Sequence, residues 1–167
     1  MAEPTRPSAV EDRDDRASRG LGHEPIPHTA DAGFRAAASD LRALFQEAAT
    51  ALSEIAADVV PGTEASVWHD VALEADDLPS LAYTWLNELI ALSDIHHAAV
   101  VGTHVIHVDS PAADEAVGRW SLRARVGLRP YAEGGVRALR QAKSATYHGL
   151  VVERQDGCWT LVAYLDL

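Results

Sequence analysis

Apolar side chains recur every three or four residues in two segments of the chain, which is the spacing of a helix that buries one face. The first segment follows Ser39, a residue type that caps helix starts by accepting a backbone hydrogen bond. Its apolar stripe runs from Leu41 to Ala56, and the residues at 59–62, VVPG, are expected to end the helix. We therefore predict an amphipathic helix with Ser39 as its N-cap.

The second segment shows the same apolar spacing from Leu78 to Ile90. Asp77 in front of it is a natural N-cap, and Pro79 falls in the first turn, where a missing N–H group costs no helical hydrogen bond. Trp85 lies on the apolar stripe. We predict a second amphipathic helix, and we expect the Trp85 side chain to pack in the core rather than to contact a ligand.

Much of the remaining chain alternates between apolar and polar residues, as strands do when they bury one face. Gln155-Asp156-Gly157 joins two such runs, and this predicts a hairpin. The predicted strands are residues 26–30, 33–38, 67–75, 98–108, 120–126, 145–153 and 158–166. Two helices packed on a largely antiparallel β-sheet give an α+β fold, which we expect to be a two-layer sandwich.

The length of 167 residues fits one domain with a core of its own. Residues 1–24 are composed mainly of Pro, Ser, Gly, Arg and acidic residues, with almost no large apolar side chain. Such a segment cannot offset its ordering entropy by burial. We therefore expect a disordered N-terminal tail over residues 1–24 and a folded domain over residues 25–167.

Several features bear on the compartment. No run approaches the roughly 18–20 apolar residues of a membrane span. The charged N-terminus lacks an apolar segment, so we expect no signal peptide. With Cys158 as the single cysteine, an intrachain disulfide is impossible, which fits a reducing cytosol. We expect a cytoplasmic protein without membrane contact, in which Cys158 is a buried strand residue.

Charge is unevenly distributed along the chain. The net charge is −11, yet residues 116–167 hold eight basic residues against four acidic ones. An overall acidic chain is a poor general binder of nucleic acids, because such binding depends on neutralising phosphates, and we expect no DNA binding. The basic last third either offsets the acidic part within the fold or meets an acidic partner or an RNA. Of the fourteen basic residues only Lys143 is a lysine, a hint that a compact ammonium is needed there.

The sequence ends at Leu165-Asp166-Leu167, directly after an alternating run, so a side-chain carboxylate and an α-carboxylate stand next to each other. Asp31 supplies an acid from the other end of the predicted fold. If these carboxylates meet, each pair about 5 Å apart repels by roughly 3 kcal/mol and requires a cation or a proton. Oxygen ligands favour Ca²⁺ or Mg²⁺. Alternatively, Asp31 stabilises a turn in which Gly33 supplies unusual backbone angles.

Four stretches, taken in order, resemble a known family. They are HTADAG at 28–33, DLPSL at 77–81 leading into WLNEL at 85–89, AKSATYH at 142–148, and the final LDL at 165–167. Their order and spacing resemble the archease family over residues 26–167. The resemblance implies a protein that is not itself a catalyst. It would activate an RtcB-type RNA ligase, promoting its GTP-dependent guanylylation and multiple turnover in tRNA splicing and RNA repair.

The resemblance also implies site residues. The family's divalent-metal site falls on Asp31, Asp166 and Leu167, the last through its backbone carboxylate, and the family's functional lysine falls on Lys143. No catalytic residue is implied. The metal would be Ca²⁺ or Mg²⁺, the partner an RNA ligase, and contact with tRNA or other RNA indirect.

Two histidines within these stretches are candidate supporting residues. His28 either assists the metal site or only braces its loop. His148 alternates with Tyr147 along a predicted strand, so we expect one of the two to face solvent or a partner. His148 is as well explained by packing or by a surface position as by function.

Other features depart from the resemblance or suggest different chemistry. Leu128-Arg129 stands where an acid is common in archeases, and we expect this change to alter the partner surface. His96-His97 and the pair His104 and His107 invite a zinc interpretation, but no cysteine pair accompanies them.

Two alternative functions remain. One is a chaperone-like binding protein that modulates a tRNA methyltransferase, a role also associated with archeases. The other is a metal-dependent hydrolase that uses Asp31, Asp166 and His148. The hydrolase is the weaker of the two, because no activated nucleophile is spaced to match and no glycine-rich phosphate loop is present in the sequence.

Overall fold

The structure is a computed structural model that describes residues 20–26, 32–111 and 118–167. It contains two α-helices among the described residues, together with strands that pair antiparallel throughout. The elements in chain order are β1 (Gly22–Ile26), β2 (Ala32–Ala38), α2 (Leu41–Ala56), β3 (Ala57–Val59), β4 (Val67–Ala75), α3 (Leu78–His96), β5 (Ala98–Asp109), β6 (Trp120–Pro130), the short 3₁₀ helix η1 (Tyr131–Glu133), β7 (Val136–Ala138), β8 (Ser144–Gln155) and β9 (Cys158–Asp166). The α+β class predicted from the sequence is confirmed.

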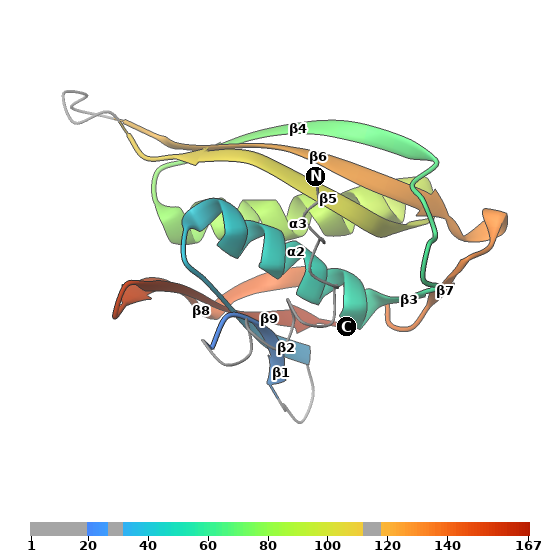
Figure 1. Ribbon diagram of the computed structural model, residues 1–167, viewed down its shortest axis with the longest axis horizontal. Coiled ribbons are helices and arrows are strands. Elements are labelled where there is room, and N and C mark those ends of the chain that lie inside the picture. Colours follow the sequence, from blue (N-terminus) through green and yellow to red (C-terminus); the bar gives the residue numbers. More distant parts are fainter. Residues whose placement is uncertain (1–19, 27–31, 112–117) are drawn as a thin grey trace, which may run out of the picture.

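The strands form more than the one sheet that the sequence suggested. A four-stranded sheet has the order β1-β2-β9-β8, a three-stranded sheet has the order β4-β6-β5, and β3 pairs with β7. Both helices lie between the two larger sheets (Figure 1). α2 packs against β2 and β5, and α3 packs against β8, β4 and β6. The expected two-layer sandwich is therefore wrong in its layering, since the helices are covered on both sides.

The double coverage follows from the width of the apolar face on each helix. The buried residues of α3 spread over about half of its circumference, as do those of α2. Trp85 is fully buried, and its indole Nε1 donates to the backbone oxygen of Phe45 on α2 over 3.1 Å. The prediction of Trp85 as a core residue is confirmed.

The helix starts agree with the sequence in one case and differ in the other. Asp77 caps α3 as predicted, with its Oδ1 accepting from the Ser80 backbone N over 2.7 Å, and hydrogen bonds from Ser80 hold the pKa of this carboxyl below its usual value. For α2 the cap is Asp40, whose Oδ1 accepts from Ala43 N over 2.9 Å. Ser39 is one residue too early, because the first helical turn begins at Leu41. Residues 59–62 do not end the helix either, since β3 has already begun at Ala57.

The hairpin predicted at Gln155-Asp156-Gly157 is confirmed. β8 and β9 are joined by Asp156 and Gly157, whose φ angles are 51° and 80°. Two consecutive positive φ angles are what a tight two-residue hairpin turn requires, and Asp-Gly is among the pairs that tolerate them. This turn sets the register of β9, and so it places Asp166 at the far end of the hairpin.

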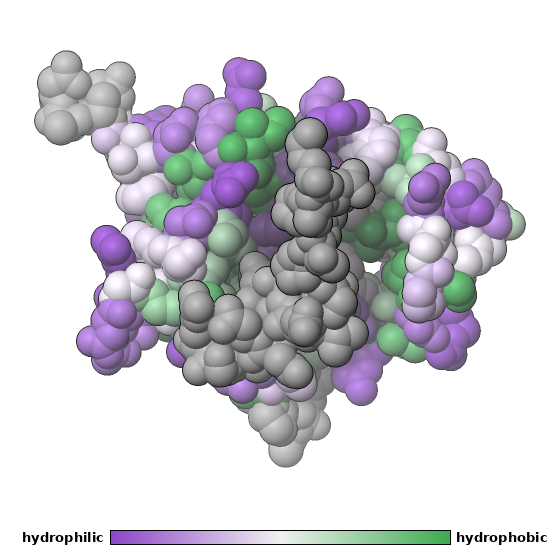
Figure 2. All heavy atoms as spheres, in the orientation of Figure 1, coloured by the Kyte–Doolittle hydropathy of each residue, from purple (hydrophilic) through white to green (hydrophobic). Residues whose placement is uncertain are grey.

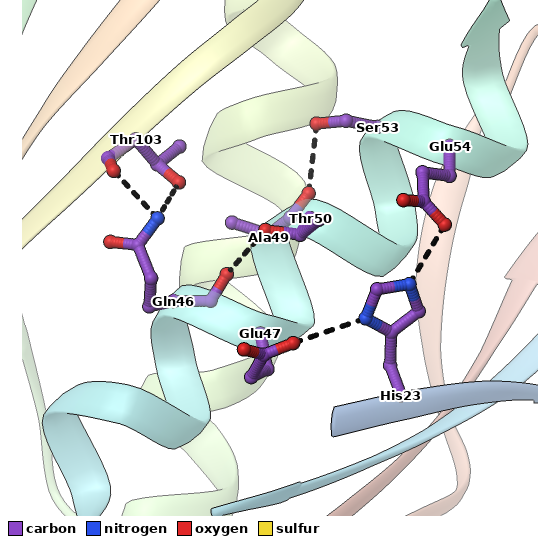
Figure 3. A network of polar contacts seen from close by, with 8 residues as sticks. All are labelled: His23, Gln46, Glu47, Ala49, Thr50, Ser53, Glu54 and Thr103. Atoms are coloured by element: carbon purple, nitrogen blue, oxygen red, sulfur yellow. Dashed lines mark hydrogen bonds and ion pairs between the residues drawn. The ribbon is translucent and has the colours of Figure 1, made fainter. Parts of the chain in front are cut away.

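β1 corrects the expected start of the fold. Residues 22–24, assigned from sequence to the tail, belong to a strand that pairs with β2. The strand was predicted at 26–30 because Ile26 is the only large aliphatic residue of β1; residues 27–30 of that prediction lie outside the described residues, as do residues 1–19. A polar contact holds β1 to the helix layer: His23 Nδ1 lies 3.2 Å from Glu47 Oε2, and Nε2 lies 2.8 Å from Glu54 Oε2 (Figure 3).

The His23 contact predicts a pH-dependent stability. The hydrogen bond to Glu47 raises the pKa of His23 above its usual value of 6.5. Burial lowers this pKa, but the contact with Glu54 raises it further, so the net direction is upward. A group whose pKa is raised on folding stabilises the folded protein fully when the pH is below the pKa that the group has in the unfolded chain. This stabilisation is lost as the pH rises through the pKa of the group in the folded protein. We therefore expect His23→Ala to lower the free energy of unfolding by about 1 kcal/mol near pH 5.5 and by much less near pH 9. Urea unfolding at both pH values measures this difference, and a loss that is independent of pH would contradict it.

On the face shown in Figure 2, hydrophilic and hydrophobic residues are interspersed over the atoms that are not grey. Within the part of the chain that the structure describes, neither helix is long and apolar enough to cross a membrane.

Candidate functional site

The end of β9 lies between the starts of two other strands. β9 is an inner strand of the four-stranded sheet, with β2 on one side and β8 on the other. Its Leu165 pairs with Ala32, the first residue of β2, and its Asp166 pairs with Ser144, the first residue of β8. The sheet therefore brings the beginnings of two strands to the C-terminal residues.

Lys143 contacts both C-terminal residues. Its backbone N donates to the backbone oxygen of Asp166 over 2.8 Å, and its Nζ donates to a backbone oxygen of Leu167 over 2.9 Å. The Lys143 side chain is exposed, and so is that of Asp166. Three of the residues assigned from sequence, Lys143, Asp166 and Leu167, are thus adjacent. Asp31 and His28 lie outside the described residues.

The donor set at this end of the sheet is made of oxygen atoms. The Asp166 carboxylate and the Leu167 backbone oxygen are hard ligands, of the kind that Ca²⁺ and Mg²⁺ prefer. Among the described residues, no group of three or more His, Cys, Asp or Glu side chains is arranged to hold a metal ion. The described part of the site therefore supplies two oxygen-bearing residues and a cation, Lys143, that already binds one of them.

Gly33 corrects one expectation from the sequence. Its φ is not positive, so the glycine is not there to permit an unusual backbone angle. Instead, a Cβ at this position would lie 2.8 Å from Cδ1 of Tyr164, the residue that pairs with Gly33 across the β2–β9 ladder. Gly149 of β8, with a φ of 72°, gives the ring the same room on its other side. The two glycines let the Tyr164 ring lie close to the sheet, two residues before Asp166.

His148 does not follow the simple alternation expected for it. The pairing of β8 with β9 is irregular between Thr146 and Val151, and within this bulge both Tyr147 and His148 are exposed. The Tyr147 ring stacks on that of Tyr83 from α3, with centroids 4.0 Å apart. The expectation that only one of the two faces solvent is wrong, because a bulge disrupts the two-residue period.

Other histidines have partners of their own. The His96 ring packs on that of His69 with centroids 4.4 Å apart, and the His104 ring stacks on Trp68 at 5.1 Å. His107 Nδ1 lies 2.9 Å from Asp109 Oδ2. Ring packing and one close contact with a carboxylate account for these three positions.

Leu128 corrects the expectation about the partner surface. Its side chain is fully buried in the core, so it cannot contact a partner. Arg129 beside it is partly exposed and binds locally, with Nη1 3.4 Å from Glu133 Oε2 and Nε donating to the Gly134 oxygen over 3.2 Å. Alternation explains the difference, since successive residues of β6 point to opposite faces.

Asn87 makes polar contacts with β8, close to Lys143, that were not predicted from the sequence. Its Oδ1 accepts from the Ala145 backbone N over 3.0 Å, and its Nδ2 lies 3.3 Å from the Ala145 oxygen and 3.0 Å from the Tyr83 oxygen. The available signal was a polar residue at the margin of the helix's buried stripe, since Asn87 is half-buried and follows the buried Leu86.

Comparisons with known proteins agree on one family. The sequence model of the archease protein family matches residues 23–167. The archease of Methanothermobacter thermautotrophicus is 40% identical over 146 residues, covering 87% of this chain and 99% of that protein. The archease of Methanopyrus kandleri is 30% identical over 144 residues, covering 86% and 98%.

Two solved structures are similar to this one. The solution structure of protein 1598 of Methanobacterium thermoautotrophicum has a TM-score of 0.70 and 29% identity, covering 87% of this chain and 99% of that one. The crystal structure of an archease and possible chaperone from Thermotoga maritima has a TM-score of 0.54 at 17% identity, covering 86% and 96%, and shows a common fold.

Proposed function

The chain belongs to the archease family, and from this premise we propose that it is a protein cofactor of an RtcB-type RNA ligase. It would promote the guanylylation of the ligase by GTP and sustain multiple turnover in tRNA splicing or RNA repair. Its partner is then a protein, with RNA contacted indirectly, and we place both proteins in the cytoplasm. The protein carries out no bond-making step of its own in this proposal.

The observation that carries the proposal is the contact of Lys143 with the last two residues of the sequence. Lys143 donates to Asp166 through its backbone and to Leu167 through its ammonium, over 2.8 Å and 2.9 Å. The backbone hydrogen bond fixes Lys143 beside the end of β9, and the hydrogen bond from Nζ directs its exposed ammonium toward the Leu167 oxygen. Such a cation is suited to meet a phosphate or an acidic group on the ligase.

We further propose that a divalent cation, Ca²⁺ or Mg²⁺, is held by Asp31, Asp166 and Leu167. Ala32, which follows Asp31 in the sequence, pairs with Leu165, and Asp166 is the next residue along β9. The three carboxylates and the Lys143 ammonium together carry a formal charge of −2, which a divalent cation neutralises. When bound, the cation would supply positive charge that orders this end of the sheet.

Multiple-turnover RNA ligation tests the proposal. The RtcB-type ligase of the same genome is mixed, at about one-hundredth of the substrate concentration, with RNA fragments that end in a 2′,3′-cyclic phosphate and a 5′-hydroxyl. We expect this protein to raise the number of turnovers per ligase at least about tenfold, the equivalent of 1.4 kcal/mol. Unchanged turnover would refute the role. Cleavage of phosphoesters by this protein alone would support the hydrolase instead.

A C-terminal extension offers a further prediction. Adding a short Gly-Ser segment after Leu167 converts its α-carboxylate to an amide and removes one negative charge from the proposed cation site. We expect ligase activation to fall at least about tenfold while the unfolding midpoint changes little, because Leu167 follows the last residue of β9 and is not part of the sheet. The same segment added before Met1 is the matched control. An extended protein that activates fully would show that the terminal carboxylate has no role.

A further inference from the structure

The Lys143 ammonium has a defined direction only if the start of β8 is fixed. The segment that leads to it, residues 139–143, is not part of a strand. β8 itself is an edge strand of the four-stranded sheet, so β9 can hold it from one side only. The backbone groups of an edge strand that point away from the sheet need partners elsewhere.

Asn87 supplies that partner. Its side-chain amide accepts from Ala145 N over 3.0 Å and donates to Ala145 O over 3.3 Å, and in this way takes the place of a neighbouring strand. The second Nδ2 hydrogen bond, to Tyr83 O over 3.0 Å, ties the same amide to the preceding turn of α3. Both oxygen and nitrogen of the amide are therefore engaged, and Ala145 is only two residues beyond Lys143.

A second amide in the molecule makes the same kind of contact at a distant place. Gln46 of α2 donates to the Thr103 oxygen over 2.6 Å (Figure 3). It also accepts from Val105 N over 3.0 Å, and so it holds the edge strand β5 of the other sheet. β5 carries none of the residues assigned to the site. Gln46 is therefore a control: it shows how much an amide side chain that joins a helix to an edge strand contributes to stability when no site residue is nearby.

We propose that Asn87 is a positioning residue for Lys143: it fixes the start of β8 and thereby directs the Lys143 ammonium toward Leu167. The effect of Asn87 on ligase activation rests on the proposed function, whereas its effect on the position of Lys143 does not. In Asn87→Asp the side chain keeps its shape but becomes a carboxylate that cannot donate and that faces the oxygens of Ala145 and Tyr83. This substitution therefore removes both hydrogen bonds that Nδ2 donates, leaves only the one accepted from Ala145 N, and opens no cavity.

The test uses the fact that Lys143 is the only lysine in the sequence, so lysine-labelled protein gives one lysine amide signal. That amide is protected from hydrogen exchange by its bond to the Asp166 oxygen. We expect Asn87→Asp to speed its exchange at least about tenfold and to reduce ligase activation by a similar factor per folded molecule. Gln46→Glu, the matched control, should leave both within about twofold.

Each outcome decides between positioning and general stability. Unchanged exchange at Lys143 in a folded Asn87→Asp protein overturns the inference, and so does an equal effect of Gln46→Glu. If Asn87→Asp does not fold, Asn87→Ala replaces it; if that also fails to fold while Gln46→Ala folds, Asn87 is structural and the inference falls. A wild-type protein that does not activate the ligase would refute the proposed function, while the exchange measurement would still decide the role of Asn87.

Discussion

Lys143→Ala is expected to remove most of the ligase activation while leaving divalent-cation binding intact. The ammonium donates to the Leu167 oxygen over 2.9 Å but is not an oxygen ligand, so its loss removes a charge and no metal ligand. A hydrogen bond to a charged group contributes about 1.5–3 kcal/mol, so we expect activation to fall by roughly 10- to 150-fold. Guanylylation rates and isothermal titration with Ca²⁺ or Mg²⁺ measure the two effects separately.

Two variants serve as controls for this result. Lys143→Arg keeps the charge but replaces the compact ammonium by a planar fork, and we expect it to restore only part of the activation. Asp166→Asn should reduce cation binding and activation together, because it removes a proposed ligand. Equal loss of cation binding in Lys143→Ala and Asp166→Asn would show that the role given to Lys143 is wrong.

Trp85→Ala is expected to cause the largest loss of stability. The indole is fully buried between the sheets and donates to the Phe45 oxygen over 3.1 Å. Its removal leaves a cavity and a buried carbonyl without its partner, which together cost about 3–5 kcal/mol. Since small domains are stable by about 5–15 kcal/mol, this is a large fraction of the total.

Urea unfolding followed by circular dichroism measures the effect of Trp85→Ala. Trp85→Phe is the matched control, because it retains most of the apolar volume and loses the hydrogen bond; we expect it to cost about 1–2 kcal/mol. A loss below about 1 kcal/mol in Trp85→Ala would contradict the packing described, since a fully buried indole cannot be removed at so small a cost.

The sequence predicted those parts of the fold that local chemistry determines. The Asp77 cap and the Asp156-Gly157 turn each depend on a few neighbouring residues, and both are confirmed. The first strand was predicted to start later in the sequence than β1 does. β1 is held by the contacts of His23 and by pairing with β2, and neither produces an apolar pattern in the sequence. The second sheet was missed because alternation shows that a strand exists but not which strand it pairs with.

The same distinction applies to the site. Lys143, Asp166 and Leu167 were assigned from the resemblance to archeases, and the structure brings these three together. The partners of Gly33 and Asn87 could not be read from the sequence, because Tyr164 and Ala145 reach them only through tertiary contacts. Leu128 was wrongly assigned to the partner surface, because a comparison of residue types with the family does not show which face of β6 a residue occupies.

Guanylylation of the RtcB-type ligase by labelled GTP, with Ca²⁺ or Mg²⁺ present, is the measurement that tests the central proposal most directly. The covalent guanylyl–ligase adduct is quantified over time without this protein, with the wild type, and with Lys143→Ala. We predict that the wild type speeds formation of the adduct at least about tenfold and that Lys143→Ala has little effect. Equal rates with and without the wild-type protein would contradict the proposal that it is an activator of this ligase.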